Sequence, residues 1–166
     1  MLPRHLRNFT AFVDGVGQAG SIESLTLPTL ALTTDTHRAG GMDGVVEIDL
    51  GMELLELSAT FASYDAILFS QFGGLDAGRT VVIRGSIQRQ GEAAQPVVIR
   101  MVGSVKNLDR GEWAAGSKAS NTATWTLQRY QETINGVEVA YIDVVGMIRR
   151  INGVDQLASQ RAALGI

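Results

Sequence analysis

The sequence places two carboxylates, Glu47 and Asp49, two residues apart, where a strand would turn both to the same side. Paired carboxylates can bind a metal ion or act as general acid and general base. No histidine, third clustered acid or nucleophile accompanies this pair, so a solvated acidic strand is the favoured interpretation. His37 stands beside Arg38 and could serve as a general base, but a local hydrogen bond within a loop is the simpler interpretation.

The chain is poor in the residue types on which most catalysis and metal binding depend. Its 166 residues include no cysteine and two histidines, His5 and His37. The absence of cysteine excludes disulfides, thiolate zinc sites and cysteine nucleophiles. A metal site built from several histidines of one chain is excluded as well. The sequence therefore predicts a protein that is not an enzyme and that carries no metal or cofactor.

Two further patterns suggest binding chemistry, and the residues around them argue against it. Residues 15–20 match the Gly-x-Gly-x-x-Gly pattern of dinucleotide-binding loops, which requires a helix directly after it. Residues 21–28 read instead as part of a strand that contains Pro28, so no helix can start there and a glycine-rich turn is expected. Trp113 and Trp125 form no base-stacking platform with arginines, and packing in the core or in a subunit contact is favoured.

Alternation of apolar and polar residues, the signature of half-buried strands, dominates the chain. It predicts strands at 81–89 and 96–105, joined by a hairpin at 90–95, with Val81, Ile83, Gly85 and Ile87 on one face. Residues 122–134 and 137–142 flank Asn135-Gly136, the strongest short hairpin signal. This hairpin should place Ile134 opposite Val137 and Tyr130 opposite Tyr141. Further strands are expected at 9–13, 22–32 (interrupted at Pro28), 44–50 and 54–61.

Helical signals are short and complete the predicted fold. Ser63 can cap a helix that contains Ile67 and Leu68 and ends at Gly73-Gly74. Asn152 can cap a C-terminal helix that ends at Gly165. The predicted fold is mainly β, an antiparallel β-barrel or sandwich with a short mid-chain helix and a short C-terminal helix. The longest run without a charge, 24–34, is far shorter than the ~20 residues of a membrane span, and we expect a cytoplasmic protein.

Charge is distributed unevenly along the chain. Residues 39–78 contain seven acids and no base, whereas residues 79–110 contain six bases and two acids. One interpretation is a dipolar monomer with solvated faces. The other is a head-to-tail contact in which the acidic surface of one copy, including Glu53 and Glu56, meets the basic surface of the next. Such contacts build rings or open stacks.

From end to end, the sequence resembles the major tail tube proteins of contractile-tailed bacteriophages and the related tube subunits of R-type bacteriocins. No single motif is specific; the order and spacing of short segments over the whole chain carry the resemblance. These segments are Leu2-Pro3, 12–15 (Phe-Val-Asp-Gly), 24–30, 38–43 (Arg-Ala-Gly-Gly-Met-Asp), 48–52, 84–86, 109–113, 115–116, 151–157 and 164–166.

The resemblance implies a single tail-tube domain, 1–166, that forms hexameric rings stacked head to tail into a hollow tube. A contractile sheath would drive the tube through the cell envelope, and DNA or ions would pass through its lumen without specific binding. A tape-measure protein and baseplate or terminator proteins would be further partners. The particle would be a virion tail or a bacteriocin, assembled in the bacterial host cytoplasm. An acidic lumen would let DNA slide without adhering.

The resemblance also implies a projecting inter-subunit arm at about 36–50. Its expected assembly residues are Arg38, Gly40, Gly41, Met42 and Asp43, with two glycines for flexibility and a methionine to fill irregular gaps. Two alternatives remain open at this point. One is the hexameric tube of a bacterial secretion system, and the other is a monomeric β-barrel that binds a small ligand.

Overall fold

The structure is a computed structural model that describes residues 2–18, 20–74 and 78–166. Within these ranges the chain is mainly antiparallel β with two short helices, as the sequence predicts. The elements are β1 (His5–Val13), β2 (Val16–Gly17), β3 (Ile22–Thr26), β4 (Leu32–His37), β5 (Val46–Met52), β6 (Leu55–Phe61), α1 (Ala66–Ser70), β7 (Arg79–Gln88), β8 (Gln95–Asp109), β9 (Asn121–Ile134), β10 (Val137–Asp143), β11 (Ile148–Ile151), β12 (Val154–Asp155) and α2 (Ala158–Leu164).

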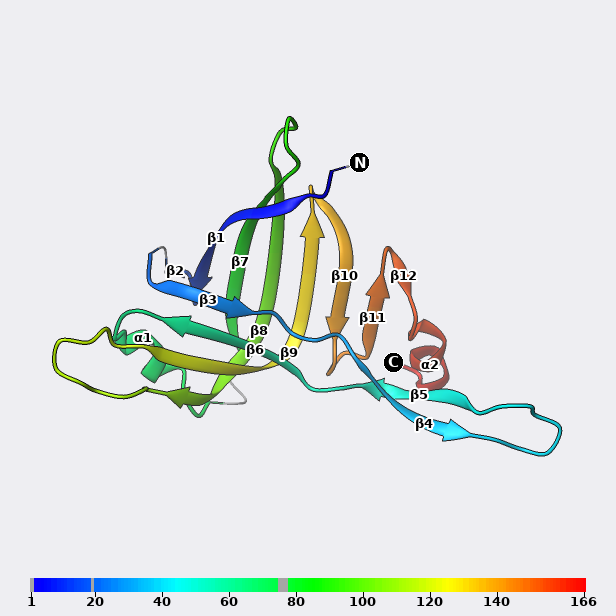
Figure 1. The fold of residues 1–166 in the computed structure, drawn as a ribbon. Coiled ribbons are helices and arrows are strands. Elements are labelled where there is room, and N and C mark those ends of the chain that lie inside the picture. The colour runs from blue at the N-terminus through cyan, green and yellow to red at the C-terminus, as the bar shows by residue number, and fades with distance from the viewer. Residues whose placement is uncertain (1, 19, 75–77) are drawn as a thin grey trace.

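The described strands form a ten-stranded sheet and a separate two-stranded sheet. The large sheet runs in the order β12-β11-β10-β9-β8-β7-β1-β2, and β6 joins it by pairing with β9 and β3. The long strand β9 pairs with β6 through its first half and with β10 through its second half. The layer that contains β3, β6 and the first half of β9 therefore crosses in front of β7 and β8 (Figure 1).

The core lies between this layer and the strands β7 and β8 behind it. Trp125 of β9 is fully buried, and its ring lies 6.2 Å from that of Phe61 on β6. The indole Nε1–H of Trp125 donates to Oε1 of Gln71, 3.3 Å away. Burial of large side chains without voids is the main stabilising term for such a fold. The fully buried side chains are Trp125, Phe61, Leu55, Leu57, Leu68, Met101, Ile142, Val13, Val81, Val105 and Ser104.

The hairpin at Asn135-Gly136 forms as predicted, and both turn residues have positive φ. Ile134 faces Val137, as expected. Tyr130, however, faces Ile142, so the expected pairing with Tyr141 is wrong. The register shifts between Glu138 and Ala140, because one extra residue in β10 forms a bulge and moves every later partner by one position.

Both helices are present, but neither begins where the sequence reading placed its cap. For α1 the cap is Asp65 rather than Ser63, since the Asp65 carboxylate accepts a hydrogen bond from the backbone N–H of Ile67 at 3.0 Å. Asn152 does not cap the C-terminal helix α2; it lies in the turn between β11 and β12, six residues before the helix begins at Ala158. Asn152 and Gly153 both have positive φ there, so this dipeptide is a second Asn-Gly hairpin. Gly165 ends α2 in a left-handed conformation, as predicted.

The strand expected at 22–32 is divided. It ends at Thr26, just before Pro28, and the chain resumes as β4 at Leu32. Strands β4 and β5 pair only with each other among the described strands, and this hairpin protrudes from the body at the lower right of Figure 1. In the glycine pattern, residues 15–18 form a turn and the short strand β2, and Ala19 lies outside the described residues. None of the described helices is long and apolar enough to cross a membrane.

Candidate assembly surfaces

The protruding hairpin, here called the arm, comprises β4, β5 and the turn that joins them. Its strands are paired from Leu32–Met52 at the base to His37–Val46 near the tip, so the hairpin begins and ends slightly outside the expected 36–50. The five residues assigned to the arm from sequence lie together in its tip. There the backbone N–H of Met42 donates to the carbonyl of Ala39 at 3.2 Å, and Arg38 donates to the carbonyl of Asp43 at 3.5 Å.

The two faces of the arm differ in character. Glu47 and Asp49 share one face, as the sequence predicts, and lie opposite threonines of β4. Val46 and Ile48 share the other face and are both about half exposed, at 48% and 46%. The pairing places His37 opposite Val46 and Asp35 opposite Ile48 on this second face. The arm therefore carries an apolar row that nothing in its own subunit covers among the described residues.

The acidic face attaches the arm to the body. The Asp49 carboxylate accepts a hydrogen bond from Arg149 of β11 at 2.5 Å, and the Arg149 side chain is almost completely buried. This hydrogen bond, with a second one from the backbone of Gly51, lowers the pKa of Asp49 below its ordinary value. Asp49 is thus a structural anchor, and the paired carboxylates do not form an acid–base site.

The two acids expected to guide docking between copies differ in their surroundings. Glu56 forms an ion pair with Lys106 of its own chain, so acidic and basic segments meet here within one subunit. Glu56 is therefore already paired within its own subunit, and its expected contact with a neighbouring copy stays a prediction. Glu53 is exposed, and the described residues offer it no ion pair. Asp76, the last acid of the acidic segment, lies outside the described residues.

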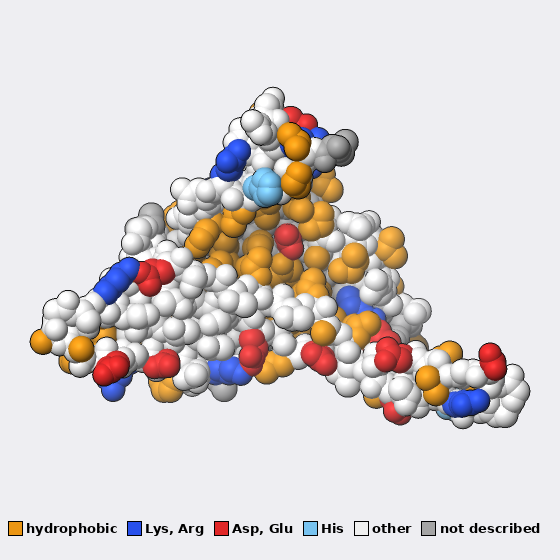
Figure 2. All heavy atoms as spheres, viewed as in Figure 1, with side chains coloured by type: hydrophobic (Ala, Val, Ile, Leu, Met, Phe, Trp, Pro, Cys, Tyr) orange, Lys and Arg blue, Asp and Glu red, His pale blue; other side chains and the backbone are white. Residues whose placement is uncertain are grey.

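A second candidate surface is an apolar groove of about 320 Å³ between β1 and the free edge of β3, over the upper part of β7, β8 and β9. Figure 2 shows this surface as a gathering of hydrophobic side chains that nothing covers. The face predicted for Val81, Ile83, Gly85 and Ile87 is confirmed, since the first two are buried and the last two line the groove. The groove is lined by Leu6, Phe9, Leu25, Leu27, Ile83, Gly85, Ile87, Val97, Ile99, Glu132 and Ile134.

Glu132 is the charged residue of this groove. Its carboxylate accepts a hydrogen bond from the hydroxyl of Tyr130 at 2.7 Å. Burial, together with this hydrogen bond, raises the pKa of Tyr130 far above its ordinary value, so the phenol remains a donor at every physiological pH. Sequence reasoning did not find the groove, because its residues come from five strands and only the alternation at 81–87 indicated one part of it.

A third surface is aromatic and lies at the end of the molecule away from the arm, near α1 (Figure 1). Trp113 is 75% exposed, and its indole N–H donates to the hydroxyl of Tyr64 at 3.0 Å. The rings of Trp113 and Tyr64 meet edge to face at 5.3 Å, and Phe69 stacks on Tyr64 at 6.2 Å. The two tryptophans therefore divide between core and surface, with Trp125 in the core.

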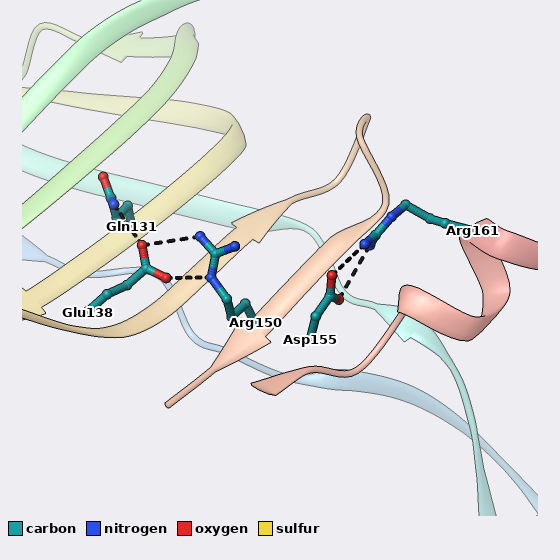
Figure 3. Close-up of polar contacts among 5 residues, drawn as sticks. All are labelled: Gln131, Glu138, Arg150, Asp155 and Arg161. Atoms are coloured by element: carbon teal, nitrogen blue, oxygen red, sulfur yellow. Dashed lines mark hydrogen bonds and ion pairs between the residues drawn. The ribbon is translucent and has the colours of Figure 1, made fainter. Parts of the chain in front are cut away.

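The face of the long sheet opposite the core is polar. Figure 3 shows Arg150 of β11 donating to both carboxylate oxygens of Glu138 on β10, while Gln131 of β9 donates to the same carboxylate at 2.9 Å. The hydrogen bond from Arg150 is the largest cause of a lowered pKa at Glu138. Arg84 and Arg100 project from this face, and no acid among the described residues pairs with them.

The C-terminal helix is held to the sheet by a second ion pair. Arg161 of α2 donates to Asp155 of β12 at 2.5 Å (Figure 3), and it also donates to the backbone carbonyl of Met147 at 2.7 Å. The hydrogen bond from Arg161 lowers the pKa of Asp155, and a further one from the Leu157 backbone adds to the shift. Within the described residues, no three acids or histidines are grouped so that they could hold a metal ion.

The chain matches the family described as phage tail tube protein FII over residues 3–165. It is 30% identical to the tail tube protein of Escherichia phage P2 over 174 aligned residues, which cover 99% of this chain and 99% of that protein. It is 29% identical to the major tail tube protein of Serratia phage KSP20 over 154 residues, which cover 92% of this chain and 90% of that protein.

Solved structures of contractile injection systems share the fold. A chain from the PVC sheath–tube complex in its extended state has a TM-score of 0.60 at 13% identity and covers 79% of this chain and 91% of its own length. A chain from the tube-terminating cap of the anti-feeding prophage has a TM-score of 0.62 at 10% identity and covers 80% of this chain and 92% of its own length. At these identities the likeness shows a common fold.

Proposed function

The chain belongs to the phage tail tube protein FII family, and on this premise we propose that it forms hexameric rings that stack head to tail into the hollow inner tube of a contractile tail. Like the other members of this family, it is a structural tail tube protein and not an enzyme. The observation that carries the proposal is the nearly full-length match, from residue 3 to residue 165.

The surfaces of the subunit support assembly. The large sheet has open edges at β2 and β12, and strand edges with unpaired backbone groups favour pairing with another chain. The arm projects away from the body, and the apolar groove and the aromatic end leave large hydrophobic side chains exposed. Exposed hydrophobic patches of this kind mark interaction sites. We infer that the arm contacts a neighbouring subunit through its tip, including Arg38, Gly40, Gly41, Met42 and Asp43.

The solved structures with this fold suggest the partners. One comes from a sheath–tube complex and another from a tube-terminating cap. We therefore infer that a contractile sheath surrounds the assembled tube, that a terminator protein closes it, and that baseplate and tape-measure proteins complete the tail. Assembly in the host cytoplasm, followed by incorporation into a virion tail or a bacteriocin particle, is part of the same proposal.

We also infer that the polar face of the long sheet lines the channel through which DNA or ions pass. Its opposite face is occupied by the core and the apolar groove, so the polar face is the one suited to water. The acidic lumen expected from sequence then becomes a mixed one, because Arg84 and Arg100 accompany the paired Glu138 and Arg150. Because the arginines outnumber Glu138 on this face, it would hold the DNA backbone more strongly than an acidic lumen would.

Electron microscopy of the purified protein tests the proposal. Rings or tubes with a central channel are expected, together with large species in size-exclusion chromatography. A compact monomer under all conditions would contradict the proposal and favour the ligand-binding alternative. Adding a purified sheath protein from a contractile-tailed phage should produce sheathed tubes.

A further inference from the structure

The apolar groove lies beside a free strand edge. β3 pairs with β6 on one side, and among the described strands nothing pairs with its other side (Figure 1). This free side borders the groove, because Leu25 and Leu27, from and just after β3, line it. A free edge beside an apolar groove is a place where an added strand gains main-chain hydrogen bonds and buries alternate side chains at once.

The arm has the complementary features. β4 and β5 pair only with each other among the described strands, so both outer edges of the hairpin are unpaired. Val46 and Ile48 project from one face with the alternate spacing that strand addition requires. At about 3.3 Å per residue, a strand the length of β5 extends roughly 20 Å, which is enough to reach into another subunit.

The arm and the groove lie at different ends of the molecule. In Figure 2 the hydrophobic surface of the groove lies in the centre of the molecule, whereas the arm leaves the body at the lower right. The acidic face of the arm is held against its own subunit by Asp49 and Arg149, so the face with Val46 and Ile48 is turned away from that anchor. Surfaces that match in character and lie at different ends of a molecule generate head-to-tail contacts between copies.

The charges of the groove and of the arm are also complementary. Covering Glu132 with a purely apolar segment would leave an ionised carboxylate buried without a cation, which is costly. The arm brings His37, opposite Val46 on the same face, and Arg38 directly after it. Asp35, opposite Ile48, also shares this face. The tip with Val46 and His37 is therefore the part suited to the neighbourhood of Glu132, while Ile48 and Asp35 would lie toward the rim.

We propose that the apolar groove of one subunit receives the arm of a second copy, which adds a strand to the free edge of β3 with Val46 and Ile48 inside the groove and Arg38 near Glu132. This inference rests on the proposed tube function, and it names the surface on which the arm docks. The natural chain contains no cysteine, so engineered cysteines report this contact without background.

Two cysteine pairs test the contact in assembled tubes, namely Val46→Cys with Leu27→Cys and Ile48→Cys with Leu27→Cys. Mild oxidation should give a ladder of covalent multimers on a non-reducing gel, which a reductant removes. The matched control is Glu47→Cys with Leu27→Cys, because Glu47 is adjacent in sequence but projects from the opposite face of the arm. The expected result is a ladder for at least one test pair and none for the control.

A charge exchange provides an independent measurement. Glu132→Arg and Arg38→Glu should each suppress tube formation, and the double variant should recover it at least in part. Glu132→Arg combined with Arg84→Glu is the control, since Arg84 projects from the polar face and should give no recovery. Circular dichroism checks folding. If Glu132→Arg does not fold, Glu132→Gln, which keeps an acceptor for Tyr130, should still weaken tube formation, and Arg38→Gln should then add nothing to the loss; an additive loss would overturn the proposal.

The outcomes separate this inference from the function on which it rests. If wild-type protein forms no tubes, the proposed function fails. If tubes form but the control pair cross-links as well as the test pairs, or no pair cross-links, the docking site is wrong and the groove serves another partner or none. If the cysteine variants do not assemble, the charge-exchange variants test the docking site instead. Failure of the Glu132→Arg, Arg38→Glu double variant to recover tube formation then overturns the proposal.

Discussion

Reversing Glu53 and Glu56 separately distinguishes attraction between copies from attraction within one subunit. Glu56 forms an ion pair with Lys106 of its own chain, whereas Glu53 is exposed and has no ion pair among the described residues. Glu53→Lys should therefore leave the monomer as stable as wild type and act on assembly alone. Glu56→Lys should destabilise the monomer as well, because it replaces an ion pair with two adjacent cations.

The magnitudes follow from exposure. The Glu56 and Lys106 side chains are 41% and 36% exposed, and such pairs contribute about 0–1 kcal/mol. Losing this pair accounts for a fall of about 2–4 °C at most in the melting temperature of the Glu56→Lys monomer, and repulsion from Lys106 adds to it. If Glu53 faces a basic surface of the next ring, a change of about 0.5 kcal/mol per contact, repeated six times, sums to about 3 kcal/mol. That corresponds to roughly a hundredfold change in the equilibrium for adding a ring.

Light scattering during polymerisation, with electron microscopy of the product, measures the effect. Glu53→Lys should slow tube growth or raise the protein concentration that it requires. High salt should do the same to wild type, because the screening length falls to about 3 Å at 1 M. Glu112→Lys is the control, since Glu112 is an exposed acid outside the acidic segment. Growth of Glu53→Lys at the wild-type rate, in low and in high salt, would refute the reasoning and leave stacking to apolar contacts.

Three further perturbations have defined outcomes. Deleting residues 40–43 removes the tip of the arm and should leave a folded monomer that forms no tubes in electron micrographs; normal polymerisation would show that the tip is not an assembly element. Gly103→Ala should lower the free energy of unfolding by about 2–4 kcal/mol in urea titrations, because the new Cβ would lie 2.1 Å from a backbone oxygen of β9. Gly44→Ala is the control and should be nearly neutral, since the space around its Cβ is open. Glu138 and Asp155 have lowered pKa values, so they stabilise the fold above their ordinary pKa values; thermal stability should fall as the pH drops below about 4, less so in Asp155→Asn, and a melting temperature that does not change with pH would contradict this.

Local signals were sufficient to predict most of the sheet. Alternation located the strands that pack on the core, and Asn135-Gly136 located a hairpin, because both signals depend on residues that are close in sequence. The same dipeptide at Asn152-Gly153 was interpreted as a helix cap, since asparagine serves both purposes and only the pairing of β11 with β12 separates them. Strand β4 was not expected as a strand of its own, because residues 33–36 are polar on both faces and show no alternation.

The candidate surfaces depend on contacts between distant parts of the chain, and sequence predicted them less well. The tip residues of the arm were taken from the resemblance, and the structure places them together because they are contiguous; their role in assembly stays a prediction. The ion pair of Glu56 with Lys106 was missed, because these residues are 50 positions apart and meet only since β6 and β8 both flank β9. The apolar groove was missed for the same reason, and a single bulge in β10 was enough to change the predicted partner of Tyr130.

Glu132 explains how a subunit with an open apolar groove can choose its occupant. A purely apolar groove would accept any exposed hydrophobic segment, including those of unfolding neighbours or unrelated chains. An ionised carboxylate within the groove must keep its hydrogen bonds, and Tyr130 supplies one of them. An occupant without a donor would leave this charge insufficiently solvated, whereas one that carries a cation gains by covering it. The groove therefore discriminates by charge as well as by shape, and the arm of the same protein carries both the apolar row and the cation that it selects.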